Sequence, residues 1–407
     1  MQTLTKKKSI TAALVMFVAV MIMLIFVGAP IQSSLGMLGL LITELLFLSL
    51  ALIGTKIMKA SFKDVFPIKK PRVRQIFGTL FIWLGSYLGV LFFTLLIGYF
   101  FPDQLGNTQE GLMGVFNSVP LPIRYLIVAV SPAICEEAVH RGFILHFLKP
   151  IQKKWLIVLI MGILFGIFHL DPIRFVATAL LGMALSYTAL ETGSMFYPFL
   201  IHLLNNSLSV GATKMMESEE MAAAASAQVI TPSVLGQYLL LLCVAPWLLW
   251  AGSALLHEKN TEPKSKEQKK ANTKILLACI LTSAVCLVGG FVMAAGNMMT
   301  NAVNTGVQTP TVSQLHETPF TTDVHIEKEG MQQLTAVMET PKGILHISIV
   351  DEAGNIAYET SAEKMTGNIP LNLKAGDYTM QVDLQGLTED EAESDETITF
   401  NLILMQF

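Results

Sequence analysis

Glu136-Glu137-Ala-Val-His140-Arg141 lies within residues 121–147, an apolar run long enough to cross a membrane. Charged and imidazole side chains at the centre of a bilayer cost about 2.5 kcal/mol or more each, so they are tolerated mainly where they face protein or water. Two more apolar runs carry such groups, in the stretches Phe165-Gly-Ile-Phe-His169 and His202-Leu-Leu-Asn205-Asn206. We therefore expect one polar site, built from three membrane-embedded segments.

The composition is that of a polytopic membrane protein. The chain has 407 residues, of which 52% are hydrophobic and 14% charged, and its mean hydropathy is +0.56, which argues against a soluble enzyme. Apolar runs near the length of about 20 residues that a crossing helix needs recur along it. Nine of them are present, at 10–28, 34–54, 76–101, 121–147, 155–170, 173–190, 194–212, 233–256 and 274–298. The sequence thus predicts a mainly α fold with about nine transmembrane helices.

Basic residues flank alternate ends of these runs. Lys6, Lys7 and Lys8 precede the first run, and basic loops lie at 69–74, 149–154 and 258–274. Cytoplasmic loops carry an excess of Lys and Arg, and nine spans make all these assignments consistent. We therefore predict a multi-pass cell-membrane protein with a cytoplasmic N-terminus and an extracytoplasmic C-terminal domain. A cleaved signal peptide is the competing interpretation of the first run, but Pro30 and the length of the run favour an uncleaved helix.

The last quarter of the chain differs from the rest in composition and in the pattern of its apolar residues. Residues 301–407 hold seventeen acidic and four basic residues. Apolar and polar residues alternate there in short stretches separated by turn signals such as Asp351-Glu-Ala-Gly354, which predicts a small antiparallel β-sandwich-like domain. The alternating stretches are 346–350, 355–358, 369–373, 378–382 and 397–402. Such an acidic domain suits soluble exposure outside the membrane, and we hypothesise that it binds a cell-surface ligand or recruits substrate.

The predicted organisation has five parts. They are two N-terminal spans with a basic cytoplasmic loop (1–74), an intramembrane core (75–256), a basic loop with the last span (257–299), a linker (300–320) and the acidic β-domain (321–407). Basic clusters lie beside spans and are explained by topology, so we expect no nucleic-acid partner. The expected partners are the lipid bilayer and a membrane-associated protein or peptide.

The polar groups of the three segments can share one layer of the membrane. At about 1.5 Å per residue, Glu136, His169 and His202 lie roughly 18, 21 and 12 Å from the cytoplasmic helix ends. Glu137 and Arg141 are spaced i and i+4, which favours an ion pair on one helix face. Glu136 is rotated by about 100° and stays outside that pair. The sequence therefore indicates one structural acid and one free acid.

The free acid suits proton transfer. A carboxylate without a permanent cation in a low-dielectric cavity can act as a general base and acid near neutral pH, and His169 can share or orient the proton of a water molecule. His202 and Asn206 are again spaced i and i+4, so two hydrogen-bond donors can point into one crevice and meet an oxyanion. Phe165 lies on the face of His169 and is expected to pack beside the site. His140 and His146 are expected to be structural or interfacial.

These three motifs, in consecutive apolar segments with Thr192-Gly-Ser194 before the last, resemble the CPBP family of CAAX proteases and bacteriocin-processing enzymes, also called Abi proteins. The resemblance covers about residues 75–255 and is strongest to type II CAAX endopeptidases. It implies that Glu136 and His169 activate water, that His202 and Asn206 stabilise the oxyanion, and that Glu137 and Arg141 form a supporting ion pair. The implied activity is that of an intramembrane endopeptidase.

The family has been assigned both as metalloendopeptidases and as metal-free glutamate-dependent enzymes. Glu136, His169 and His202 could supply a set of two histidines and one glutamate to a divalent metal such as zinc, with water as the fourth ligand. No His-Glu-x-x-His motif is present in the sequence, and Asn206 would be an unusual neighbour for zinc. We therefore favour a catalytic mechanism without a metal ion.

Two other classes of function remain open at this stage. A non-catalytic membrane scaffold or bacteriocin-immunity protein would keep its effect when Glu136 is changed to Gln. A transporter could use Glu136 and the histidines as a proton relay, although no internal inverted repeat is evident. The identity of the substrate, and whether it is prenylated, stay open.

Overall fold

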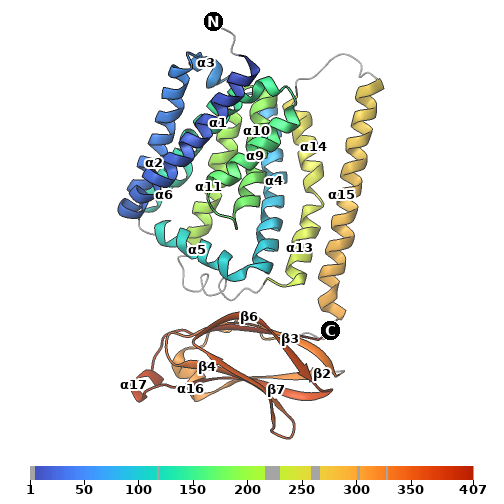
Figure 1. Cartoon of the computed structure of the whole chain (residues 1–407). Coiled ribbons are helices and arrows are strands. Elements are labelled where there is room, and N and C mark those ends of the chain that lie inside the picture. Colours follow the sequence, from blue (N-terminus) through green and yellow to red (C-terminus); the bar gives the residue numbers. More distant parts are fainter. Residues whose placement is uncertain are drawn as a thin grey trace. The chain divides into compact units, whose positions relative to one another are not determined.

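The computed structural model describes residues 5–116, 119–215, 230–257, 266–299, 303–326 and 329–406. They divide into two bodies, a helical one and one that holds all the described β-strands, and each is treated by itself (Figure 1). The helices are α1 (Lys6–Met23), α2 (Ala29–Ile57), α3 (Phe62–Val65), α4 (Val73–Phe100), α5 (Pro102–Phe116), α6 (Leu121–Arg124), α7 (Ser131–Glu137), α8 (Leu145–Leu148), α9 (Lys154–Phe168), α10 (Phe175–Thr192), α11 (Phe196–Met215), α13 (Pro232–Leu242), α14 (Ala245–Leu256) and α15 (Lys266–Met299). Part of the predicted basic loop, 258–265, lies outside the described residues.

Within the described residues, five helical stretches are long and apolar enough to cross a membrane. They are Lys6–Ile57, Val73–Phe100, Phe175–Thr192, Pro232–Leu256 and Gln268–Ala294. The predicted mainly helical fold with several apolar spans is therefore confirmed. The number nine stays a prediction, because α9 is a shorter apolar helix and residues 121–148 are divided among several short helical segments.

The first stretch is a helical hairpin. A straight helix of 52 residues would be about 78 Å long, more than twice the roughly 30 Å of a hydrocarbon core. Gly36 interrupts it with φ 54° and ψ −128°, a backbone conformation that costs glycine little. A Cβ atom at Gly39 would lie 2.3 Å from the carbonyl oxygen of Ile31, so only glycine fits there. α1 and α2 consequently lie side by side (Figure 1).

The segment that carries the first motif is not a regular α-helix. Two π-helical segments, Tyr125–Val130 and Ala138–Ile144, flank α7. Pro132 at the start of α7 has no N–H to donate to the carbonyl of Val128, four residues earlier. π-Helical turns widen a helix locally and occur often at functional sites. The widening here falls on both sides of Glu136 and Glu137.

Helices α9 and α10 pack closely against each other, because small residues line their interface. A Cβ atom at Gly162 would lie 2.8 Å from the carbonyl oxygen of Ala179, and one at Gly182 would lie 2.7 Å from Cβ of Phe165. The turn between the helices contains Leu170, whose φ of 52° is uncommon for a non-glycine residue. This packing fixes Phe165 and the end of α9 against α10.

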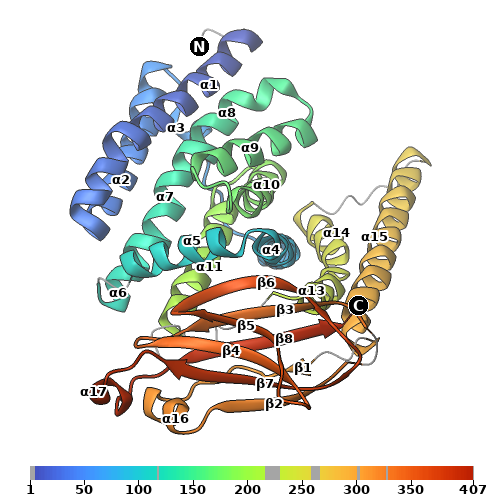
Figure 2. The ribbon, with the colours of Figure 1, turned by 60° about the horizontal axis from the view of Figure 1, so that its bottom comes forward.

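The second body contains two four-stranded antiparallel sheets, in the orders β1-β8-β3-β6 and β2-β7-β4-β5 (Figure 2). The strands are β1 (Val303–Asn304), β2 (Phe320–Ile326), β3 (Gly330–Glu339), β4 (Ile344–Asp351), β5 (Ile356–Ala362), β6 (Lys364–Leu373), β7 (Gly376–Gln385) and β8 (Thr399–Gln406). Inward residues of both sheets, such as Leu334, Ile347 and Phe400, share one buried core. The predicted antiparallel β-region is confirmed.

Two features of this region follow from the local sequence. Hydrogen bonds from the side-chain and backbone amides of Asn355 hold the pKa of Asp351 below its ordinary value, and Gly354 supplies the φ of 82° that the turn between β4 and β5 requires. Within the predicted linker, the short helix α16 (Val312–Glu317) begins at a capping box of Thr311 and Gln314. Its Val312 packs into the β core.

Helices α4 and α14 meet at glycines, which yields a test of the packing. A Cβ atom at Gly78 would lie 2.9 Å from the carbonyl oxygen of Gly252, whereas one at Gly89 would lie 3.7 Å from a side-chain atom of Leu180. We predict that Gly78→Ala destabilises the protein by about 1–3 kcal/mol, because overpacked helices must separate. Gly89→Ala in the same helix should be tolerated. Thermal unfolding in detergent measures both, and equal stability of the two variants would contradict this packing.

Candidate functional site

A buried ion pair lies at the centre of the polar cluster. Nη1 of Arg141 donates to Oε1 of Glu137 at 2.8 Å, and both side chains are almost fully buried. The same guanidinium donates through Nε to Oγ of Ser186 at 3.3 Å and through Nη2 to the carbonyl of Gly182 at 3.0 Å. It also lies 4.5 Å from the centre of the Phe165 ring. The pair therefore joins α7 and its π-helical continuation to α9 and α10.

His202 of α11 lies between the two glutamates. Its Nδ1 is 2.8 Å from Oε1 of Glu137, and its Nε2 is 3.9 Å from Oε2 of Glu136. A carboxylate only accepts hydrogen bonds, so Nδ1 carries a proton. Nε2 can then donate only when the ring bears a second proton. The expected role of His202 as an oxyanion donor thus requires the imidazolium form.

Glu136 stays outside the ion pair of Glu137. Its side chain is 10% exposed, and its Oε2 receives no hydrogen bond within the described part of the chain. No Lys or Arg among the described residues forms an ion pair with it, since Arg141 turns to Glu137. One oxygen of Glu136 is therefore free to bind a water molecule or a substrate group.

His169 follows the last residue of α9 and is half-buried. Its Nδ1 donates to the carbonyl of Phe165 at 2.8 Å. A carbonyl oxygen only accepts, so the neutral ring carries its proton on Nδ1 and leaves the lone pair of Nε2 to accept one. No hydrogen bond or ion pair joins His169 directly to Glu136 among the described residues. Nε2 of His169 is the nitrogen suited to take a proton from water.

Phe165 connects the cationic and imidazole groups. Its ring centre lies 4.8 Å from that of His169, 5.1 Å from that of His140 and 5.9 Å from that of His202, each in an edge-on arrangement. Phe165 is 1% exposed. The sequence placed it beside the site, and the structure puts it in contact with four of the polar residues, Arg141 included.

Asn206 makes a contact that the sequence did not indicate. Its Nδ2 donates to the carbonyl of Val128 at 3.0 Å. That carbonyl lacks the usual helical donor because the residue four positions later is Pro132. One amide hydrogen of Asn206 thus binds a carbonyl of the π-helical segment before α7, and the second is the one left for an oxyanion.

The two other histidines of this region have partners of their own. Nδ1 of His140 donates to the carbonyl of Glu136 at 2.9 Å, and its buried ring packs on Phe165 and Phe168. Nδ1 of His146 donates to the carbonyl of Asp64 at 3.0 Å. Both contacts are those of residues that support the fold.

Two charged residues near the site were not among the sequence candidates. Glu44 of α2 is 2% exposed and interacts with the carboxyl of Glu136. Arg174, just before α10, interacts electrostatically with both His169 and Glu136. Glu44 is the sole charged residue of the apolar run 34–54. The rule that singled out Glu136, a charge within an apolar run, could have found Glu44 as well.

The alternative of a metal centre can be tested against the donor set. Among the described residues, no group of three or more His, Cys, Asp or Glu side chains is gathered so as to hold a metal ion. Nδ1 of His169 and Nδ1 of His202 are each used in a hydrogen bond to another acceptor, which leaves Nε2 of both rings available. Metal-bound histidines are oriented in the same way, so these hydrogen bonds do not separate the two mechanisms. The metal-free mechanism stays a prediction.

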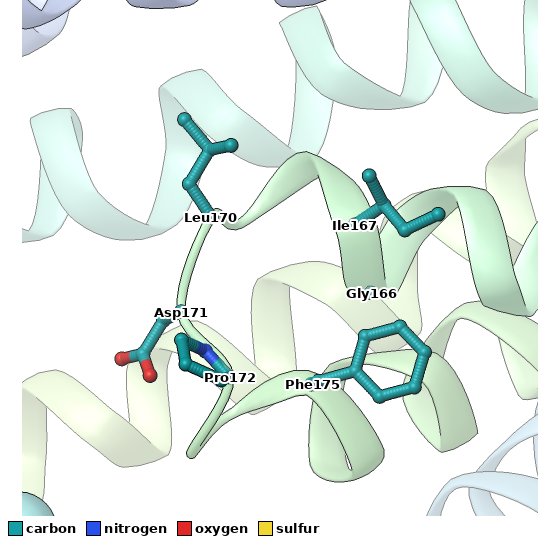
Figure 3. Close-up of a pocket in the computed structure, with 6 residues that line it drawn as sticks. All are labelled: Gly166, Ile167, Leu170, Asp171, Pro172 and Phe175. Carbon is teal, nitrogen blue, oxygen red and sulfur yellow. The ribbon is translucent and has the colours of Figure 1, made fainter.

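A pocket of about 290 Å³ opens at the turn between α9 and α10, next to His169. It is lined by Gly166, Ile167, Leu170, Asp171, Pro172 and Phe175 (Figure 3). Figure 3 shows the carboxylate of Asp171 at the end of the pocket away from the ring of Phe175. Oδ1 of Asp171 accepts hydrogen bonds from the backbone amides of Ile173 and Arg174, which fixes the turn.

Comparison with protein families identifies the segment that holds most of these residues. Residues 118–208 match the family described as type II CAAX prenyl endopeptidase Rce1-like. The predicted resemblance to the CPBP family is thereby confirmed for this segment, which carries all three motifs. This family is one of proteases. No curated protein matches the chain.

The ion pair at the centre yields a prediction about stability. Removal of one partner of a buried pair leaves an uncompensated charge and costs about 3–5 kcal/mol, whereas a largely exposed pair is worth less than about 1 kcal/mol. Arg141→Ala should therefore destabilise the protein far more than Lys154→Ala, because the side chain of Lys154 is 61% exposed and its partner Glu191 keeps a contact with His257 at 3.0 Å. Denaturant titration in detergent measures both. Similar losses in the two variants would contradict the central role of the pair.

Proposed function

We propose that the protein is an intramembrane endopeptidase that hydrolyses peptide bonds of membrane-associated proteins or peptides. The observation that carries this proposal is that the neighbouring residues Glu136 and Glu137 have different electrostatic partners. Oε1 of Glu137 is held by Arg141 and His202, whereas Glu136 forms no ion pair with Lys or Arg among the described residues of the same buried cluster. Oε2 of each acid has no hydrogen-bond partner there. A membrane protein gains nothing in stability from such a free acid, so a chemical role is the better explanation.

In the proposed reaction, Glu136 and His169 take the proton of a water molecule as its oxygen attacks the carbonyl carbon of the substrate. The C–O bond forms and the carbonyl oxygen becomes an oxyanion. His202, as the imidazolium, and the second amide hydrogen of Asn206 are the proposed donors to that oxyanion. When the C–N bond breaks, the proton held by Glu136 or His169 passes to the leaving amine. The match of residues 118–208 to a protease family supports this assignment.

Two substitutions test the mechanism. Glu136→Gln and His169→Ala should each lower kcat by about 10²- to 10⁴-fold, the usual effect of losing a general base, while the protein still inserts into membranes. Proteomics of membranes containing wild type or Glu136→Gln identifies substrate candidates, and cleavage by purified protein in liposomes measures the rate. His146→Ala is the matched control and should retain activity.

Two outcomes would contradict the proposal. Retained turnover in Glu136→Gln or in His169→Ala would exclude this mechanism. A protective phenotype that survives Glu136→Gln would favour a non-catalytic scaffold or immunity protein.

We also propose that the protein lies in the cell membrane with its acidic β-domain outside the cell. The basic residues that flank alternate apolar runs support this orientation. In that position the β-domain could bind a cell-surface ligand or recruit substrate. The proposal makes the two ends of α15 accessible from opposite sides.

Cysteine labelling tests this topology. Glu352 is exposed in the turn between β4 and β5, and Lys269 is exposed near the start of α15. A membrane-impermeant maleimide should label Glu352→Cys on intact cells, and Lys269→Cys only after lysis, with the unmodified chain as the control for its native cysteines. Labelling of Lys269→Cys on intact cells, with Glu352→Cys protected, would contradict this orientation and indicate the opposite one.

A further inference from the structure

Glu44 has a position that the proposed reaction does not yet use. It lies in α2, outside residues 118–208, and is the sole charged residue in an apolar run of the sequence. At about 1.5 Å per residue, it lies roughly 20 Å from the end of α2. This is close to the depth expected for Glu136. A carboxyl at such a depth is costly unless a neighbouring group compensates it.

The face of α2 that carries Glu44 is turned toward the candidate site. Phe47, one helical turn later, packs edge-on against Phe168 with ring centres 5.1 Å apart. Phe168 in turn contacts the rings of His140 and His169 at 4.9 and 5.5 Å. α2 also packs along α7, the helix of Glu136. Glu44 therefore reaches the site by the same surface that buries Phe47.

The carboxyls of Glu44 and Glu136 interact with each other where α2 packs along α7. Oε2 of each is buried and has no hydrogen-bond partner among the described residues. Two carboxyls in contact away from water cannot both be ionised, and a hydrogen bond between them needs one proton. With Glu136 acting as the base, that proton resides on Glu44.

We propose that Glu44 is a positioning residue, whose carboxyl donates a hydrogen bond to one oxygen of Glu136 and so directs the other oxygen toward the reacting water. The proposal rests on the proposed peptidase function. Glu44 touches neither water nor substrate in this role, and its proton stays within the pair during turnover. The hydrogen bond restricts the rotation of a side chain that no Lys or Arg among the described residues holds in an ion pair.

Two variants of Glu44 separate positioning from packing. Gln keeps the shape and an N–H donor, so Glu44→Gln should retain kcat within about threefold of wild type. Leu fills the space but donates nothing, so Glu44→Leu should lower kcat about tenfold or more, the factor expected for loss of a hydrogen bond to a charged group, with KM within about twofold. Both are measured with the full chain in liposomes, and thermal unfolding confirms that Glu44→Leu is folded. Wild-type kcat in folded Glu44→Leu, or equal losses in the two variants, would overturn the proposal.

An infrared measurement distinguishes failure of this inference from failure of the peptidase function. The pair should give one protonated-carboxyl C=O stretching band in wild type that is absent from Glu44→Gln, whether or not the protein cleaves a peptide. The absence of such a band in wild type would overturn the shared-proton pair. Its presence in a protein without peptidase activity would keep the pair and remove only its proposed catalytic purpose.

Discussion

The ion pair between Glu137 and Arg141 carries a desolvation cost that further hydrogen-bond partners help to offset. Those partners come from separate parts of the chain, since Arg141 also binds α10 and stacks on Phe165 of α9, while Glu137 binds His202 of α11. The pair thus fixes four helical segments relative to one another. Because Glu137 and Arg141 neutralise each other, the adjacent Glu136 is left without an ion pair to Lys or Arg among the described residues, and the free acid is a consequence of the structural one.

The position of a free carboxyl beside an ion pair carries more information in a membrane protein than in a soluble one. In water, a free carboxylate next to an ion pair would be ordinary, whereas in a hydrocarbon layer each polar group needs a partner or a purpose. Glycines bring α9 close against α10, so that Phe165 of the cluster packs directly on α10. The irregular turns on both sides of α7 carry further polar contacts, such as the amide of Asn206 on the carbonyl of Val128. Polar residues and π-helical turns therefore gather in the same region.

The sequence predicted the parts of this site that depend on local geometry. The spacing of Glu137 and Arg141 indicated a pair because four residues make one helical turn, and alternation located most of the strands of the β-region. The sequence did not predict which atoms of distant segments are in contact. His202 meets Glu137 across 65 positions. β3 escaped detection because Gln332, a polar residue, points inward and bonds the backbone of Leu373.

The central claim is that Glu136 and His169 activate one water molecule together, although they come from different helices. The rate of the Glu136→Gln/His169→Ala double variant, compared with both single variants and wild type in liposomes, tests this most directly. Residues that act as a unit give strongly non-additive losses. The account predicts that the double variant is about as slow as the slower single variant. Losses that multiply across the two substitutions would contradict it, because the two residues would then act independently.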